Sequence, residues 1–490
     1  MAIRDIRENR LKKLKRLEKA GIAPFPETTE RTHKIVEALF GFNKLERTKK
    51  QLTLAGRIRS LRQHGKATFL DIQDGTGKIQ VYLREDKLGE AEYKFFLDNF
   101  DIGDFIEVKG ALFRTKKGER TIEAAAFEML AKSLLPLPEK WHGLKDIEER
   151  FRKRYLDLIF NPEIKKRFET RSRIIKEIRG FLENEGFLEV ETPILQPIYG
   201  GATARPFKTH LNALNMDLYL RIAPELYLKR LLVGGFEKVY EIGKCFRNEG
   251  VDRQHNPDFT MLEFYWAYAD YKKLMKLTER MFEALLKKIF GKLNINYEGK
   301  EINFKPPWPM LEFSQIFRKY TKIDLDRIHP KALKEKAEAI GIKVPSEAGK
   351  AEIADELYKK FCRPKIWNPT FLIHYPAEAK PLAKPLEKNP SKSASFQLVV
   401  AGWELVNAYS ELNDPILQRK RFKEQERLFG KGLEDAQRVD EDFLEALEYG
   451  MPPAGGFGLG VDRLVALLTN SHSLREAILF PAMRAKKIKN

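Results

Sequence analysis

The segment Glu241–Glu263 reads EIGKCFRNEGVDRQHNPDFTMLE, and it says most about how this chain folds. A polar loop joins two strand-like runs, so the segment predicts a β-hairpin. Arg247 precedes Glu249 by two residues, and Phe259 follows the loop. A fixed guanidinium beside a flat aromatic ring suits a site that binds a triphosphate, a carboxylate and a purine. Taken alone, FRNE favours a simpler interpretation, a hairpin whose turn carries a salt bridge.

Length and charge set the broad class of this protein. The chain has 490 residues, enough for two or three domains that each bury a core. It carries 89 Lys and Arg against 70 Asp and Glu, a formal charge of +19. Such an excess favours a polyanionic partner, because neutralising phosphates releases counterions. Generic surface charge is the alternative.

Cysteine content and hydropathy indicate the compartment. Cys245 and Cys362 are the only cysteines, too few for a disulfide framework or a cysteine-based zinc site, and they suit a reducing cytoplasm. No apolar run approaches the roughly twenty residues that a membrane span requires. The N-terminal stretch is charged from Arg4 onward and lacks the apolar core of a signal peptide. We therefore expect a cytoplasmic protein that makes no use of a membrane.

The N-terminal part of the chain divides into two regions. Residues 1–48 predict a basic helical segment, which either lies along nucleic acid or is a solvated leader. Residues 49–136 contain five strand patterns separated by turn signals such as Asp74-Gly75. A helix-like stretch near Glu90–Asn99 stands between the third and fourth strands. This arrangement predicts a five-stranded OB-type β-barrel that binds single-stranded nucleic acid.

Three barrel residues could contact such a strand. Phe69 is a candidate stacking platform, although its pattern is equally compatible with a place in the core. Gln80 and Glu119 are candidate readers of base edges. Residues 137–149 are proline-rich and predict a rigid linker. Residues 150–490 predict one large mixed domain with a helical insertion at about 305–370.

Two further stretches accompany the hairpin. GFLEVETPIL, at residues 186–195, predicts a strand that ends at a proline, and GFGLGVDR, at residues 456–463, predicts a glycine-rich strand-to-helix turn. In this order, behind an OB-type barrel, the three segments resemble motifs 1, 2 and 3 of the class II aminoacyl-tRNA synthetases of the aspartate, asparagine and lysine subgroup. The resemblance implies an α+β fold whose catalytic domain is an antiparallel sheet flanked by helices.

Within this subgroup the chain resembles the lysyl-tRNA synthetases most closely. The matching stretches include YGGATARPFKTH, HNPDFTMLEFYWAYADY, NAYSELNDP and LEYGMPP. The resemblance implies a lysine–tRNA ligase whose substrates are L-lysine, ATP and tRNA(Lys), with the barrel reading a U-rich anticodon. Motif 1 of this class builds a two-fold interface, so the resemblance also implies a homodimer.

The implied reaction forms an aminoacyl-adenylate. Charge builds on the phosphorus oxygens, so catalysis requires fixed cations and Mg²⁺ more than a general base. By resemblance, Arg247 bridges the α-phosphate and the amino acid carboxylate, and Arg463 covers adenine or reaches the γ-phosphate. Glu249 and His255 correspond to residues on the adenine and phosphate sides, and Phe259 to the aromatic ring that stacks on adenine.

Three acids on apolar or aromatic stretches point to a cationic substrate. These are Glu225, Glu263 and Glu411. Several buried carboxylates without partners are costly, and for each one an internal salt bridge is the alternative. By resemblance, Glu225 and the Gly201 backbone bind the α-ammonium of lysine. Glu411, with Glu263 and Tyr265, binds the ε-ammonium.

The remaining ligands implied by the resemblance lie between Gln397 and Tyr409. Asn407 joins Arg247 at the carboxylate, and Tyr409 packs along the methylene groups. Mg²⁺ is expected at Glu404, because hard cations prefer carboxylate oxygen. The chain departs from the family at Gln397, where bacterial members usually carry a second glutamate, so the number of metal ions is open.

A second departure lies in the hairpin loop. Gln254 stands where many relatives place an arginine. Two alternatives stay open: the neighbouring Arg253 compensates for the missing arginine, or the contacts with pyrophosphate are weaker.

Other functions stay open at this stage. An aspartate- or asparagine-specific relative would need a cation at the side-chain end of the pocket, where this chain has Glu411. A paralogue that modifies a protein would resemble the catalytic domain alone. A nucleic-acid-binding protein that kept only the fold would be expected to lose Arg247 or Arg463, and both are present.

Overall fold

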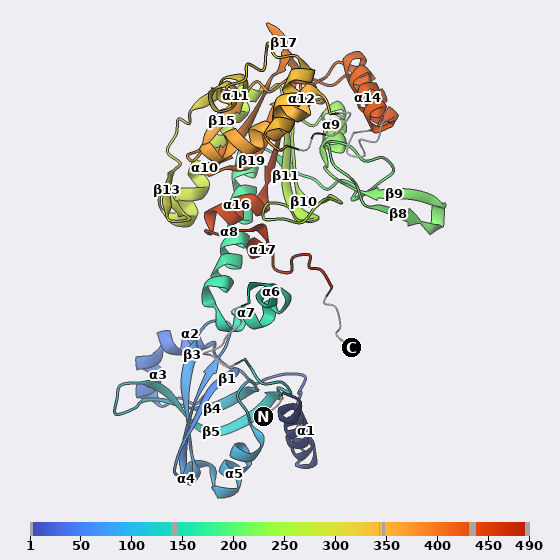
Figure 1. The fold of residues 1–490 in the computed structure, drawn as a ribbon. Coiled ribbons are helices and arrows are strands. Elements are labelled where there is room, and N and C mark those ends of the chain that lie inside the picture. The colour runs from blue at the N-terminus through green and yellow to red at the C-terminus, as the bar shows by residue number, and fades with distance from the viewer. Residues whose placement is uncertain (1–2, 139–145, 343, 345–347, 431–437, 486–490) are drawn as a thin grey trace. The chain divides into compact units, whose positions relative to one another are not determined.

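The computed structural model describes the chain except for residues 1–2, 139–145, 343, 345–347, 431–437 and 486–490 (Figure 1). It divides into two compact units, Met1–Lys145 and Asp146–Asn490, each with a hydrophobic core of its own. Residues 139–145 of the expected linker lie outside the described residues. Among the helices of the described residues, none is long and apolar enough to cross a membrane.

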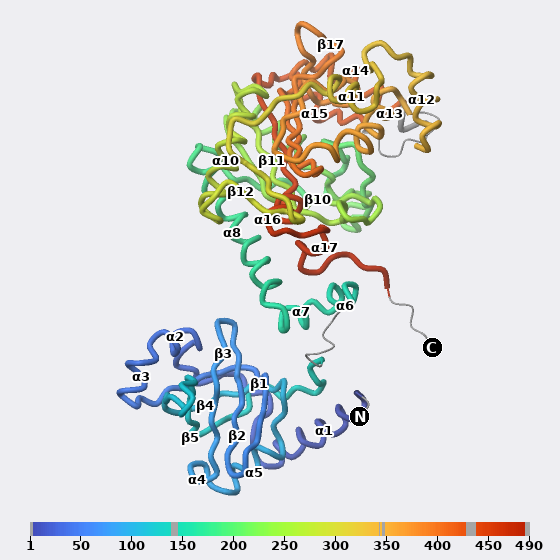
Figure 2. The backbone as a smooth tube through the Cα atoms, turned by 60° about the vertical axis from the view of Figure 1, so that its left-hand side comes forward, coloured from blue at the N-terminus to red at the C-terminus, as the bar shows by residue number. Residues whose placement is uncertain are grey.

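The first unit is the expected five-stranded barrel. Its strands close in the order β1-β2-β3-β5-β4, because β5 pairs with β3 on one side and with β4 on the other (Figure 2). In β2 and β3 every second residue is buried, which places one side of each strand in the core. The bounds are β1 Leu52–His64, β2 Ala67–Gln73, β3 Lys78–Arg84, α4 Glu85–Leu88, α5 Glu90–Asn99, β4 Phe105–Arg114 and β5 Arg120–Ala131.

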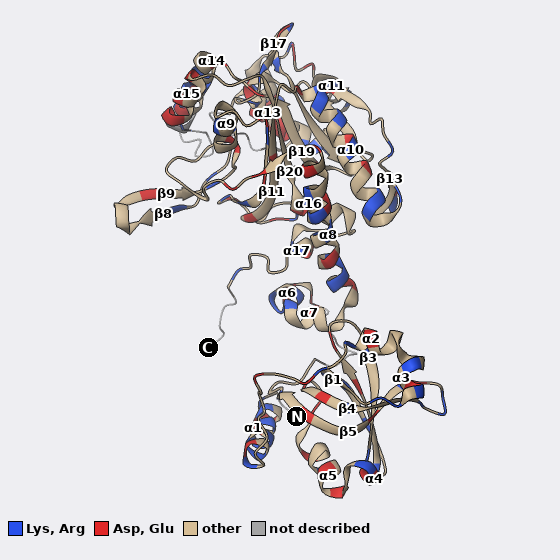
Figure 3. Cartoon of the chain, turned by 180° about the vertical axis from the view of Figure 1, so that it is seen from behind, with Lys and Arg blue, Asp and Glu red and all other residues tan. Residues whose placement is uncertain are grey.

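Three helices precede the barrel in the chain: α1 Ile3–Lys19, α2 Ile35–Phe40 and α3 Phe42–Thr48. Lys and Arg are frequent along α1 (Figure 3). One of them, Arg10, is buried and donates hydrogen bonds to the carbonyl oxygens of Ile102, Ser133 and Leu135. Helix α1 is therefore fastened to the barrel by this arginine, whereas most of its other basic residues remain exposed or half-buried.

The second unit is built on an eight-stranded sheet with the order β14-β15-β18-β19-β20-β11-β10-β6. Neighbouring strands are antiparallel except in the outer pairs β14–β15 and β10–β6. Helices α8, α10 and α16 cover one face, which confirms the expected antiparallel sheet flanked by helices. The strands are β6 Leu188–Glu189, β10 Lys238–Phe246, β11 Asp258–Ala267, β14 Met310–Glu312, β15 Thr370–Ile373, β18 Ser395–Val400, β19 Trp403–Ser410 and β20 Ala454–Gly460.

The central strands β11 and β20 alternate between a covered face and an open face. Phe264 of β11 stacks on Phe457 of β20 in the helix-covered core, with ring centroids 4.4 Å apart. The residues between the core positions point to the opposite face, and on β20 these residues are glycines. The uncovered face therefore has room for a ligand in the middle of the sheet.

A helical segment lies between β14 and β15, within the region where the insertion is expected. It has its own core around Phe313 and Phe317. Its elements are α11 Phe313–Thr321, α12 Pro330–Ala339, α13 Lys350–Leu357, the π-helical turn η2 Tyr358–Cys362 and the 3₁₀ turn η3 Arg363–Lys365.

The remaining helices of the second unit are α6 Ile147–Arg152, α7 Arg154–Phe160, α8 Pro162–Asn184, η1 Asn212–Leu214, α9 Glu225–Val233, α10 Tyr271–Phe290, η4 Ala377–Ala379, α14 Pro415–Gly430, α15 Glu441–Glu448, α16 Val461–Leu468 and α17 Leu474–Ala477. The remaining strands form three small sheets: β7 Leu195–Gln196, β8 Lys208–Leu211, β9 Met216–Leu220, β12 Asn294–Tyr297, β13 Lys300–Asn303, β16 Pro385–Leu386 and β17 Asn389–Ser393.

Candidate active site

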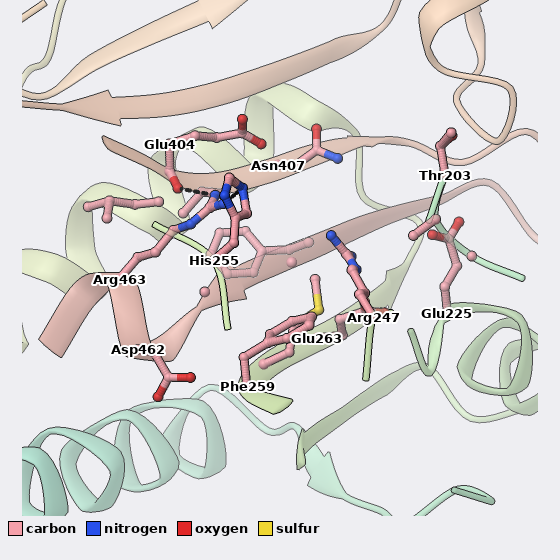
Figure 4. Close-up of a pocket in the computed structure, with 18 of the residues that line it drawn as sticks. Thr203, Glu225, Arg247, His255, Phe259, Glu263, Glu404, Asn407, Asp462 and Arg463 are labelled. Carbon is pink, nitrogen blue, oxygen red and sulfur yellow. Dashed lines mark hydrogen bonds between the residues drawn. The ribbon is translucent and has the colours of Figure 1, made fainter. Parts of the chain in front are cut away.

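A cavity of about 280 Å³ lies over the uncovered face of the central sheet. The site residues expected in the second unit line it, with the exception of Glu411. They are Gly201, Glu225, Arg247, Glu249, His255, Phe259, Glu263, Tyr265, Glu404, Asn407, Tyr409 and Arg463. In Figure 4, Thr203 and Glu225 lie at one end, His255 and Arg463 lie at the other, and Arg247 points between them.

Strand register explains how residues distant in sequence meet. Gly458 of β20 stands between Glu263 on β11 and Asn407 on β19. Two residues earlier, Gly456 stands between Tyr265 and Tyr409 in the same way. The period of two in a strand thus places two pairs of functional side chains on either side of bare backbone.

Glycine is required at position 456 because a Cβ there would lie 1.7 Å from Glu411 Oε1 and 2.6 Å from the Tyr265 ring. Glu411 therefore reaches the wall of the cavity at the place where residue 456 has no side chain. Gly201, with φ +86°, is also constrained, since its Cβ would lie 2.9 Å from that of Glu225.

Arg247, Lys380 and Arg463 form what we call the cationic half of the cavity. The Arg247 guanidinium lies 5.0 Å from the Phe259 ring centroid, and its Nε has no partner among the described residues. Arg463 donates to the Glu404 carbonyl oxygen at 3.0 Å and to His255 Nε2 at 3.4 Å (Figure 4). Within the described chain, no carboxylate oxygen lies within 4.0 Å of these two guanidinium groups.

The loop after Arg247 holds His255 in a defined tautomer. Its Nδ1 donates to Asp252 at 2.8 Å, which leaves Nε2 as the acceptor for Arg463. Burial acts to raise the pKa of Asp252, but hydrogen bonds from His255 and from the Gln254 backbone outweigh it and lower the pKa. Glu249 is exposed at the rim of the cavity.

Gln254 lines the cavity from the hairpin loop. The neighbouring Arg253 forms an ion pair with Glu298 at 2.5 Å and is not among the residues that line the cavity. Instead, Arg363 donates to Gln254 Oε1 at 3.3 Å. This arginine begins η3 in the helical insertion, far from the hairpin in sequence.

Glu225, Glu263 and Glu411 form the acidic half, and each is at most 4% exposed. Tyr409 donates to Glu225 at 2.8 Å, and Tyr265 donates to Glu263 at 3.1 Å. The two phenol groups thus give Glu225 and Glu263 a neutral hydrogen-bond donor each.

Lys229 is the internal cation of the acidic half, and sequence reasoning overlooked it. This fully buried residue lies 2.6 Å from Glu225 and 2.5 Å from Glu411. Neither Glu411 oxygen receives an aligned hydrogen bond from a described residue. The i,i+4 spacing of Glu225 and Lys229 on a helix was a signal that could have revealed the first ion pair. One lysine among three acids leaves the group net negative when all are ionised.

Burial is the largest cause of the pKa shifts of Glu263 and Glu411. It raises the pKa of Glu263 to about 8, with a further contribution from the negative charge of Glu225. The pKa of Glu411 is raised as well, because burial outweighs the attraction of Lys229. Near neutral pH, Glu263 therefore favours the protonated form when no further cation is beside it.

Glu404 is the cavity carboxylate beside Arg463 and Lys380, where a divalent cation is expected from the sequence. Burial acts to raise its pKa, but the positive charges of Arg463 and Lys380 outweigh it and lower the pKa. Gln397 is buried on β18, does not line the cavity and accepts a hydrogen bond from Tyr375. The described residues contain no group of three His, Cys, Asp or Glu that could hold a metal. This donor set suits Mg²⁺ that arrives on phosphate oxygens and takes one protein carboxylate.

The barrel presents an aromatic row on its surface. Phe69 is partly exposed and stacks on Tyr82 at 4.5 Å, and Tyr82 lies 5.9 Å from Phe113. The Thr121 hydroxyl donates to Gln80 Oε1 at 2.9 Å and lies 3.2 Å from the Glu119 carbonyl oxygen. Phe69 lies on β2, Tyr82 and Gln80 lie on the neighbouring strand β3, Phe113 lies on β4, and Glu119 directly precedes β5.

Comparison with known proteins identifies the class. The family described as tRNA synthetases class II (D, K and N) matches residues 146–484, and the OB-fold nucleic acid binding domain family matches residues 52–134. The chain therefore belongs to the class II tRNA synthetases, and this membership makes it an aminoacyl-tRNA ligase that uses ATP.

Curated relatives narrow the class to one family. A lysine–tRNA ligase of Carboxydothermus hydrogenoformans is 52% identical over 478 residues, which cover 97% of each chain. That of Moorella thermoacetica is 50% identical over 485 residues, covering 99% of this chain and 98% of the relative. That of Roseiflexus castenholzii is 49% identical and covers 99% of this chain and 100% of the relative. The chain belongs to the lysine–tRNA ligase family.

Proposed function

We propose that this enzyme activates L-lysine with ATP, releases pyrophosphate and transfers the lysyl group from lysyl-adenylate to tRNA(Lys). The observation that carries the proposal is the division of one cavity into a cationic half and an acidic half. ATP is a polyanion, and lysine carries two ammonium groups. The cationic half is complementary in charge to ATP, and the acidic half is complementary to the ammonium groups of lysine. One cavity can therefore bind both substrates at once.

In the first step a lysine carboxylate oxygen attacks the α-phosphorus of ATP, and the bond to the leaving pyrophosphate breaks. Arg247, whose guanidinium can bind two anions together, aligns the carboxylate with the α-phosphate. Phe259 stacks on adenine, and His255 and Arg463 bind the phosphate and adenine side, with Glu249 at the rim. Glu404 would hold Mg²⁺ accompanying ATP, and this ion would neutralise charge on the phosphate oxygens.

The acidic half selects the amino acid. Glu225 and the Gly201 backbone bind the α-ammonium, while Glu263, Tyr265 and Glu411 bind the ε-ammonium. Tyr409 lies along the methylene groups, and Asn407 adds a hydrogen bond at the carboxylate. In an aspartate-specific relative this half would need a net positive charge, whereas here Lys229 is already shared between two carboxylates.

Pyrophosphate exchange with each of the twenty amino acids, with and without tRNA, tests the reaction and the specificity together. Lysine alone should drive exchange of label from pyrophosphate into ATP. Exchange with aspartate but not with lysine would overturn the proposed specificity. No exchange with any of the twenty amino acids would overturn the proposed activity.

The barrel is proposed to bind the anticodon of tRNA(Lys), with Phe69 stacking on a base and Gln80 and Glu119 contacting base edges. Phe69→Ala should raise the KM for tRNA by about 5- to 150-fold, because base stacking contributes about 1–3 kcal/mol. Pyrophosphate exchange without tRNA should not change. Phe25→Ala removes another exposed ring of the same unit and should leave the KM unchanged. A loss of exchange in Phe69→Ala would mean that the ring has a structural role.

We further propose that the enzyme is a homodimer that works in the cytoplasm. Leu188, Ile194 and Leu195 in the first motif are 46–50% exposed, an apolar group suited to a two-fold interface. The two cysteines are free, which suits a reducing compartment. Sedimentation of the full chain should give twice the monomer mass, and Leu195→Asp should halve it. A monomeric wild type would contradict the dimer.

A further inference from the structure

Lys380 is a cavity residue that the roles above leave unexplained. It follows the turn η4 and lines the cavity beside Glu404 and Asn407. Its Nζ donates to Asn407 Oδ1 at 2.8 Å and lies 5.0 Å from the centroid of the Tyr375 ring. Both partners are neutral. In the part of the chain that the structure describes, no carboxylate oxygen lies within 4.0 Å of this ammonium.

A sheltered ammonium without an anionic partner is costly, so its environment indicates a missing anion. Lys392 in the same region shows the usual solution, since it forms an ion pair with Glu312 at 3.0 Å. Lys380 instead faces a cavity whose other cations, Arg247 and Arg463, also lack a carboxylate partner. The Glu404 carboxylate attracts Arg463 and Lys380 from beyond 4.0 Å, and a ligand anion in the cavity would add the close partner that all three cations lack.

The fold places Lys380 and Arg247 on two sides of the reacting groups. Residues 383–384 pair with the end of β19, so the segment of Lys380 lies over that strand. Arg247 follows β10, and strands β20 and β11 lie between β10 and β19 in the sheet. A triphosphate over β20 and β11 would therefore meet one cation from each side.

We propose that Lys380 is a further catalytic residue, whose ammonium contacts the triphosphate of ATP and supplies part of the positive charge otherwise provided by divalent metal. This proposal rests on the adenylation reaction proposed above. It accounts for the protein side of the metal site, where Glu404 lines the cavity and Gln397 is neutral and bonded to Tyr375. The ammonium of Lys380 is part of the protein, so it can neutralise phosphate charge without a metal ion first having to bind.

The test measures ATP binding to the full-length enzyme by calorimetry in EDTA, where no divalent ion contributes. Wild type should bind ATP, and Lys380→Met should bind it at least about tenfold more weakly, as expected for loss of a charged hydrogen bond. Lys380→Arg should retain affinity within about threefold, because the charge remains. Any loss of lysine affinity should be smaller than the loss of ATP affinity, because Lys380 reaches the lysine substrate only through Asn407.

Lys384→Met is a matched control, because Lys384 also donates to an asparagine oxygen, that of Asn413 at 3.0 Å, and does not line the cavity. It should bind ATP like wild type. Equal ATP affinity in wild type and Lys380→Met would overturn the proposal, and so would a loss confined to lysine affinity.

Titration of Mg²⁺ in the exchange assay gives a second readout. Lys380→Met should need a higher Mg²⁺ concentration for half-maximal rate, and Lys384→Met should not. An unchanged Mg²⁺ requirement in Lys380→Met would count against the role of Lys380 as a partial substitute for the ion. Failure of the adenylation proposal itself would be distinct, since wild type would then show no lysine-dependent exchange at any Mg²⁺ concentration.

Discussion

The two halves of the cavity handle charge in opposite ways. In the cationic half, Arg247 and Arg463 contact an aromatic ring, a histidine and a backbone carbonyl. In the acidic half, burial holds the pKa of Glu263 at about 8 and raises that of Glu411. The half proposed to bind ATP is therefore built of cationic side chains, whereas the half proposed to select lysine contains an acid, Glu263, that gains charge when a cation arrives.

The largest effect on the exchange rate should come from removing the guanidinium of Arg247, which lies between the two halves of the cavity (Figure 4). Arg247→Met should lower the rate of lysine-dependent pyrophosphate exchange by about 10³-fold, because one fixed donor in such a site contributes about 10²–10³ and this residue faces two anions. Arg247→Lys should recover only part of the rate, since a point charge cannot bind both anions through a fork. A loss below tenfold in Arg247→Met would show that the halves do not meet at this residue.

The acidic half is tested by removing one charge without changing shape. Glu411→Gln should lower kcat/KM for lysine by about 10- to 150-fold, the range for a buried hydrogen bond to a charged group. ATP affinity should remain that of wild type. Steady-state exchange kinetics at varied lysine measure the first quantity and calorimetry the second. Unchanged lysine kinetics would remove Glu411 from the pocket.

The wall between Glu411 and the cavity offers a smaller and purely steric perturbation. Gly456→Ala places a methyl group 1.7 Å from Glu411 Oε1, so the carboxylate must move. Overpacking of about 1–3 kcal/mol predicts a rise in lysine KM of about 5- to 150-fold, towards the lower end if the Glu411 side chain can rotate. Gly458→Ala is the matched control, since its Cβ would first meet the flexible end of Met261 at 3.1 Å. Equal effects in both variants would mean that lost space in the cavity, which both glycines line, and not displacement of Glu411 causes the rise in KM.

The smallest expected effect is the release of a proton when lysine binds. It is also the most direct test of the difference between the two halves. With a pKa of about 8 in the free enzyme, Glu263 is mainly protonated at about pH 7. An ammonium group beside it favours the carboxylate, so lysine binding should release a proton near pH 7 and release less as the pH rises above the pKa. Lysine titrations in two buffers of different ionisation enthalpy measure this release. Glu263→Gln should reduce it, whereas identical heats for wild type in both buffers would contradict it.

Much of this site could be predicted from local sequence pattern. Alternation along β11 places Glu263 and Tyr265 on one face, and the matching glycine run of β20 leaves that face open. The barrel followed from strand patterns and turn signals, and these lie at the ends of the observed strands. Such features depend on neighbours within a few residues, which a single sequence displays.

Partners supplied by distant segments could not be predicted. Lys229 was hidden on an apolar helix face, and its contact with Glu411 depends on tertiary packing across nearly two hundred residues. Lys380 stands in the proline-containing stretch AEAKPLAKP, a pattern typical of a solvated loop. Its shelter arises only because that loop packs over β19.

As the proposed contact for the ε-ammonium, Glu411 would also determine which errors such an enzyme makes. A site that depends on a donor from its substrate rejects an analogue without that donor by about 10⁴- to 10⁵-fold. Loss of one methylene group is detected far less well, by about 10- to 200-fold. Leucine and methionine, whose side chains lack this donor, should therefore be rejected at the initial binding step. Ornithine, which keeps the terminal ammonium on a shorter chain, is the amino acid against which the fidelity of protein synthesis is most exposed.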